Sequence, residues 1–158
     1  MSENKLLKIA LILSIITIVY NIAEGIVSVY YGMDDDALSL LGFGSDSFVE
    51  VISGIGIAHM VLRMRYSKVQ QRDKFEKTAL RVTGVSFYIL TTGIIIGSII
   101  NIIQNNKPVT TFPGLIIASL SILTMYFLMS AKLRIGKKLN SDAIIADANC
   151  TKSCLYLS

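Results

Sequence analysis

Residues 37–62 read ALSLLGFGSDSFVEVISGIGIAHMVL, an apolar stretch that carries two acids, Asp46 and Glu50. The hydrocarbon core of a bilayer is about 30 Å thick, and a helix needs about 20 apolar residues to cross it. Apolar runs of this length are typical of membrane-spanning helices rather than of helices in soluble cores. The stretch therefore predicts a transmembrane helix that holds two carboxyl groups within the bilayer.

Other apolar blocks repeat this pattern along the chain. They cover residues 6–31, 82–103, 113–131 and 143–158. The chain is 53% hydrophobic and only 16% charged, whereas about a quarter of the residues of a soluble domain are charged. Two prolines and two cysteines fit neither a disordered chain nor a disulfide scaffold. We therefore expect one all-α domain over residues 1–158, a polytopic transmembrane helix bundle.

The basic residues are divided unevenly between the segments that connect these blocks. One side of the predicted membrane holds Lys5, Lys8, Arg63, Arg65, Lys68, Arg72, Lys74, Lys77, Arg81, Lys132, Arg134, Lys137 and Lys138, whereas the opposite loops hold only Lys107. Loops rich in lysine and arginine stay in the cytoplasm. We therefore expect an integral protein of a prokaryotic cytoplasmic membrane with a cytoplasmic N-terminus. This topology explains the basic clusters without nucleic acid as a partner.

Asp46 and Glu50 are four residues apart, so they project from the same face of one helix with their Cα atoms about 6 Å apart. Two like charges this close in a low dielectric cannot both ionise without a cost. A divalent cation would neutralise both, and protons would compete with the metal for the same groups. The pair predicts metal–proton exchange. The alternative is that the acids only form hydrogen bonds between helices.

The last apolar block repeats the same spacing with sulfur, because Cys150 and Cys154 are also four residues apart. Two cysteines on one helical face do not have the geometry of a disulfide. Two thiolates and two carboxylates can form a tetrahedral site for zinc or a similar ion. The candidate metal ligands are therefore Asp46, Glu50, Cys150 and Cys154. The alternative for the cysteines is that they are ordinary small apolar residues of a helix.

Further polar residues within the apolar blocks are candidates for an accessory role or a proton path. They are Asn21, Glu24, Asp147 and Lys152. Charged groups within membrane spans usually face the bundle interior or a water-filled cavity. Asn21 and Glu24 share a helical face, and Lys152 can pair with an acid from another helix, which would lower the cost of burying both groups.

Other features of the blocks favour packing over chemistry. Gly93 and Gly97 form a small-xxx-small pattern, which lets helices approach closely. His59 follows Glu50 by nine residues, or about 13 Å along a helix axis, which is too far for a shared site. We expect His59 to be an interfacial histidine.

These residues resemble the membrane domain of the cation diffusion facilitator family of divalent-metal transporters. The second helix of that family carries a His or Asp, three further residues and an Asp; residues 46–50 are similar, with Glu50 in place of the second Asp. Its fifth helix carries Ala-Asp, then a His and, four residues later, an Asp. Residues 146–147 match the Ala-Asp, and Cys150 and Cys154 stand at the next two positions. Thiolates in place of His and Asp favour softer ions.

The resemblance implies a divalent metal cation transporter that exports zinc or a similar ion by proton antiport. It also implies a homodimer of the compact branch that lacks a cytoplasmic domain, with metal as the substrate and no prosthetic group. The family has six helices, and residues 143–158 are short of a full span. We expect a truncated chain or domain fragment, and the alternative is a re-entrant last segment. No phosphate-binding loop, nucleophile elbow or HExxH motif is present, so we expect no enzymatic activity. The alternative is a non-transporting membrane interaction protein whose buried polar residues stabilise helix packing.

Overall fold

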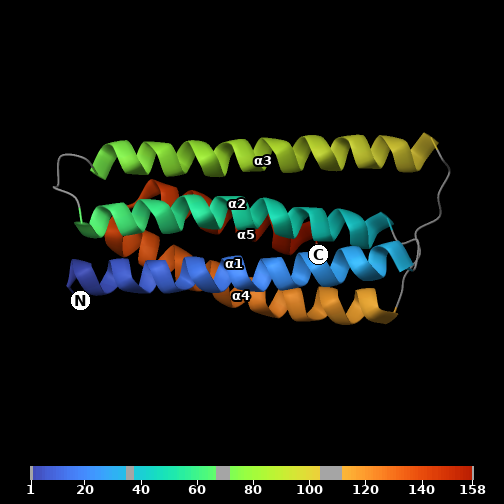
Figure 1. Ribbon diagram of the computed structural model, residues 1–158, viewed down its shortest axis with the longest axis horizontal. Coiled ribbons are helices and arrows are strands. Elements are labelled where there is room, and N and C mark those ends of the chain that lie inside the picture. Colours follow the sequence, from blue (N-terminus) through green and yellow to red (C-terminus); the bar gives the residue numbers. More distant parts are fainter. Residues whose placement is uncertain (1, 35–37, 67–71, 104–111, 158) are drawn as a thin grey trace.

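The computed structural model describes residues 2–34, 38–66, 72–103 and 112–157. These residues form a bundle of helices that run alternately in opposite directions (Figure 1). The helices are α1 (Glu3–Asp34), α2 (Leu38–Tyr66), α3 (Arg72–Ile103), α4 (Phe112–Leu139) and α5 (Asp142–Leu157). The expected all-α bundle is confirmed.

Four of these helices are long and apolar enough to cross a membrane. The candidate spans are Glu3–Met33, Leu40–Arg65, Asp73–Ile100 and Gly114–Leu139. The outward faces are rich in exposed isoleucine, leucine and aromatic residues, and every residue from 91 to 100 is exposed. Such a surface is compatible with an integral membrane protein, because lipid tails solvate it whereas water does not.

Two helices extend well beyond the apolar blocks that predicted them. α3 begins at Arg72 instead of residue 82, and α4 continues to Leu139 instead of ending at 131. The apolar blocks measure only the part of a helix that lies in hydrocarbon. Lysine, arginine, glutamate and leucine all favour helix, so the hydrogen-bonded backbone continues into the charged residues. The predicted boundaries of these two helices were therefore wrong.

The short α5 packs against α2, α3 and α4 (Figure 1). α1 packs against both α2 and α4. The apolar core lies at the end of the bundle that contains the N-terminus. It includes Leu6, Leu7, Ala10, Ile57, Met60, Val61, Met64, Ala79, Ile135, Ala143 and Ile144. The inward positions further along the bundle are largely polar.

A tight turn reverses the chain between α4 and α5. Asn140 adopts a left-handed conformation with φ of 51°, and the N–H of Ser141 donates to the carbonyl of Gly136 at 3.0 Å. This arrangement ends a helix while satisfying one of its last carbonyl groups. The Glu76 carboxylate of α3 accepts a hydrogen bond from the Ala143 N–H at 3.3 Å. Both contacts direct α5 back into the bundle.

Close approach of α1 and α2 depends on glycine. A Cβ atom on Gly44 would lie 2.9 Å from Val29 Cγ2 and 3.1 Å from the carbonyl oxygen of Gly25. By contrast, a Cβ atom on Gly93 or Gly97 would meet nothing within 4 Å. Within the described chain, the small-xxx-small pattern of α3 therefore packs on no other helix.

Candidate metal site

Polar side chains line the inner face of α1 at helical spacing. Thr17, Asn21, Glu24 and Ser28 follow one another at intervals of four, three and four residues, and all are buried. This period places them on one stripe of the helix. The stripe faces α2, the helix with which α1 packs most extensively. Its polar side chains therefore lie beside the acids of α2, and Asn21 donates a hydrogen bond to Glu50.

The four predicted metal ligands come together between α2 and α5. The Sγ atom of Cys154 donates a hydrogen bond to Oδ1 of Asp46 at 3.1 Å. Cys154 also interacts with the side chains of Cys150 and Glu50. None of the four residues is more than 5% exposed. Two residues of α2 and two of α5 therefore share one buried site, although about a hundred residues separate them in sequence.

The side chains in this site stand in a hydrogen-bonded arrangement instead of a coordination shell. Among the described residues, no group of three or more histidine, cysteine, aspartate or glutamate side chains is arranged so that it could hold a metal ion. A thiol proton lies between Cys154 and Asp46. Because thiolate, not thiol, binds a metal, the ion would have to displace such a proton.

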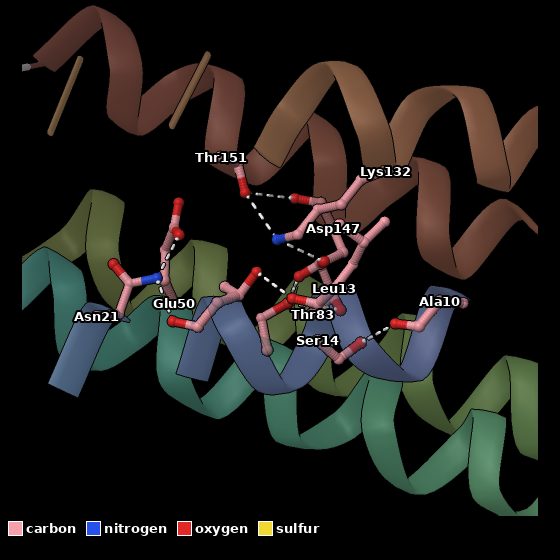
Figure 2. Close-up of polar contacts among 11 residues, drawn as sticks. Ala10, Leu13, Ser14, Asn21, Glu50, Thr83, Lys132, Asp147 and Thr151 are labelled. Carbon is pink, nitrogen blue, oxygen red and sulfur yellow. Dashed lines mark hydrogen bonds and ion pairs between the residues drawn. The ribbon is translucent and has the colours of Figure 1, made fainter. Parts of the chain in front are cut away.

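Glu50 is only partly satisfied by its neighbours. Its Oε2 atom accepts a hydrogen bond from Nδ2 of Asn21 at 3.0 Å, which Figure 2 shows facing it from α1. The same amide nitrogen donates to the Thr17 carbonyl at 3.0 Å. Oε1 of Glu50 and Oδ1 of Asn21 are buried and have no hydrogen-bond partner in the described structure. Buried polar atoms are normally paired, so these two oxygens have an unused capacity to bind a cation or a proton.

Glu24 has both carboxylate oxygens occupied. Tyr20 donates its hydroxyl to Oε1 at 2.8 Å, and Ser47 donates its hydroxyl to Oε2 at 3.0 Å. The carboxylate also interacts electrostatically with Asp46. Glu24 therefore borders the site from α1, and its oxygens are held by protein donors. This geometry suits an accessory position better than a ligand position.

A buried lysine that the sequence analysis assigned to a cytoplasmic loop lies next to the site. Lys132 of α4 is only 2% exposed, and its ammonium forms an ion pair with Oδ2 of Asp147 at 2.9 Å. It also donates to the Thr151 hydroxyl at 3.0 Å (Figure 2). Ser53 of α2 donates to Oδ1 of Asp147 at 2.7 Å and shares a hydrogen bond with Thr83 of α3. The assignment of Lys132 to a loop was therefore wrong.

Lys152 does not take the inward role expected of it. Its side chain is exposed, and its ammonium lies 5.9 Å from the ring centroid of Tyr156 on the same helix. On α5, the buried positions are those of Asp147, Cys150 and Cys154. Lys152 falls between these positions on the helix surface and points away from them. Lys132 pairs with an acid of α5 instead, so the expectation for Lys152 was wrong.

A periodicity in α4 could have identified Lys132 from the sequence. Ser121, Met125, Leu128, Lys132 and Ile135 follow one another at intervals of four, three, four and three residues, and all of them are buried. Intervals of three and four residues place side chains on one face of a helix. The lysine lies on that inward stripe and has two basic neighbours, Lys137 and Lys138, that lie off it and are exposed.

Comparison of the chain with protein-family models, with curated proteins and with solved structures finds no match in any of the three.

Proposed function

We propose that this protein is a carrier of a divalent metal cation, zinc or a similar ion, with a membrane domain like that of the cation diffusion facilitator family. The observation that carries the proposal is the meeting of Asp46 and Glu50 with Cys150 and Cys154 in one buried site. Two carboxylates and two sulfurs are a ligand set that suits zinc. The unpartnered Oε1 of Glu50 supports the same proposal, because a cation would satisfy it.

Charge balance also supports a cation at this site. Two carboxylates and two thiolates would carry four negative charges, and a divalent ion would neutralise only half of them. The buried ammonium of Lys132 interacts electrostatically with Glu50 and Cys150. It therefore lies close to the proposed ligands without occupying a ligand position, and its own charge is balanced by Asp147. Asp147 holds that ammonium through the ion pair at 2.9 Å, which is a positioning role.

Proton exchange follows from the chemistry of the same ligands. Thiols and carboxylic acids must lose their protons before they coordinate a metal, so metal binding releases protons. The hydrogen bond from the Cys154 thiol to Asp46 holds one such proton in the site. Protons returning from the opposite side would release the metal. We propose export by proton antiport, with a cytoplasmic N-terminus in a prokaryotic membrane and a homodimer as the assembly.

The test is zinc uptake into proteoliposomes that contain the full chain. We expect the wild-type protein to take up zinc in exchange for protons that leave the vesicles down their own gradient. The Asp46→Ala, Cys150→Ala double variant should take up zinc no faster than empty vesicles. The matched control is the Ser45→Ala, Asn149→Ala double variant, because these neighbours on the same two helices are exposed. The proposal is wrong if wild-type protein transports zinc no faster than the Asp46, Cys150 variant.

One observation favours a second candidate, a non-transporting membrane interaction protein. The buried polar groups join the helices to one another, since Ser53 connects α2 with both Asp147 of α5 and Thr83 of α3. Polar contacts between helices stabilise membrane bundles. This candidate predicts that substitutions of Asp46 lower stability while zinc neither binds nor stabilises the protein. A zinc-dependent rise in the melting temperature that Asp46→Ala abolishes would exclude it.

A further inference from the structure

A groove separate from the candidate metal site lies between α2 and α3, towards the end of the bundle that contains the N-terminus. Its volume is about 520 Å³, within the range of roughly 300 to 1,000 Å³ that is usual for small-molecule sites. It is lined by Ile52, Ile55, Gly56, His59, Arg63, Lys74, Phe75, Thr78, Ala79 and Val82. Both helices are candidate membrane spans over this part, so the groove faces the bilayer.

The two ends of the groove differ in chemistry. Three basic side chains, His59, Arg63 and Lys74, gather at the end where α2 finishes and α3 begins. The Arg63 guanidinium lies 5.8 Å from the ring centroid of Phe75, which also lines the groove. Among the described residues, no acid lines the groove and neither Arg63 nor Lys74 forms an ion pair. Arg63 and Lys74 therefore give this end of the groove positive charge that no ion pair of the described residues balances.

The deeper part of the groove is apolar. Ile52 and Ile55 are 47% and 53% exposed along α2, and Val82 lines the groove from α3. Apolar walls do not suit a hydrated metal ion, which needs oxygen or sulfur ligands. They suit a hydrocarbon chain, whose transfer from water is favourable in proportion to the area it buries. A ligand that fits both ends has an anionic head and a hydrocarbon tail.

We propose that this groove binds an anionic phospholipid. The phosphate would lie at Arg63 and Lys74, and an acyl chain would follow Ile52, Ile55 and Val82. Basic pockets between transmembrane helices bind anionic headgroups in this way. The inference is independent of metal transport, because the groove contains none of the candidate metal ligands.

The test is native mass spectrometry of the full chain from micelles that contain equal amounts of phosphatidylglycerol and phosphatidylcholine. We expect wild-type protein to retain phosphatidylglycerol in preference. The Arg63→Gln, Lys74→Gln double variant should reduce this preference by about 25-fold, since each basic residue near an anionic lipid surface contributes a factor of roughly five. Thr78→Phe, which fills the groove from an exposed position and keeps the charges, should reduce retention of both lipids.

The control is the Lys137→Gln, Lys138→Gln double variant, which removes two exposed charges at the end of α4. We expect it to retain phosphatidylglycerol like the wild type. If this control loses as much preference for phosphatidylglycerol as the Arg63→Gln, Lys74→Gln variant, then binding depends only on overall charge and the proposal is overturned. Equal retention of the two lipids by the wild type would also overturn it. Displacement of the lipid by excess glycerol phosphate would overturn it as well, because a free phosphate compound would then be the ligand.

Discussion

The ammonium of Lys132 lies 2.9 Å from Oδ2 of Asp147, and the two side chains, each 3% exposed, form a buried ion pair between α4 and α5. Thr151 accepts a hydrogen bond from the same ammonium, and Ser53 donates one to the other carboxylate oxygen. These contacts leave neither charge without a partner. The pair therefore orients α5, the helix that carries Cys150 and Cys154, relative to α4 and α2.

Removal of one charge from this pair should be strongly destabilising. Lys132→Met leaves the Asp147 carboxylate buried without its cation, and we expect a loss of about 3 to 5 kcal/mol in the free energy of unfolding. The double variant Lys132→Met, Asp147→Leu should recover part of that loss, because two apolar side chains need no partner. Denaturation in mixed micelles, followed by circular dichroism, measures both values. Additive losses in the double variant would show that the two residues are not coupled.

A side chain at Gly44 should separate α1 from α2. Gly44→Ala places a methyl group 2.9 Å from Val29 Cγ2, and overpacking of this kind costs about 1 to 3 kcal/mol. Gly42→Ala is the matched control two residues away, because a Cβ atom there meets nothing within 4 Å. We expect Gly42→Ala to leave the melting temperature unchanged or to raise it, since alanine favours helix. Equal melting temperatures for the two variants would contradict this account of the contact.

The Tyr20 hydroxyl should contribute to stability because it donates a hydrogen bond to the buried carboxylate of Glu24. Tyr20→Phe leaves Oε1 of Glu24 without the donor that lies 2.8 Å from it, and we expect a loss of about 1 to 3 kcal/mol in unfolding free energy. Tyr30→Phe removes the same hydroxyl from a tyrosine that is 66% exposed. This control should have no measurable effect. The expectation fails if the two variants have the same stability.

The cysteines should give a spectroscopic signal if they coordinate a metal. Cobalt(II) is a suitable probe because thiolate ligands produce intense charge-transfer absorption in the near ultraviolet. We expect this band in wild-type protein and its loss in the Cys150→Ser, Cys154→Ser double variant, since a hydroxyl is a poor ligand for soft ions. Asn149→Ala, an exposed neighbour on α5, should keep the band. Absence of the band in wild-type protein would exclude sulfur from the site.

The orientation in the membrane can be tested with single cysteines in a Cys150→Ser, Cys154→Ser background. Met33, which is 69% exposed, lies near the end of α1, whereas Lys137 lies near the end of α4, at the opposite end of the bundle (Figure 1). The positive-inside rule predicts that a membrane-impermeant maleimide labels Met33→Cys but not Lys137→Cys in intact cells. The reverse labelling pattern would place the N-terminus outside.

The basic cluster at the end of α4 contains lysines with two different environments. Lys137 and Lys138 are exposed at the end of α4, as a topological signal should be. Lys132 belongs to the same cluster in sequence, yet it turns inward. A count of charges along the chain does not record the rotation of a helix. The error at Lys132 came from that omission.

The sequence alone predicts the helical class, the four long apolar spans and the shared faces of Asp46 with Glu50 and of Cys150 with Cys154. These properties depend on hydropathy and on the 3.6-residue period, which are local to each helix. Three further features are seen only in the packed bundle: α2 and α5 face each other, Asp147 pairs with Lys132, and Lys152 points outward. Those outcomes depend on how the helices rotate and pack together, because burial of each polar group is tolerated only where another helix supplies its partner.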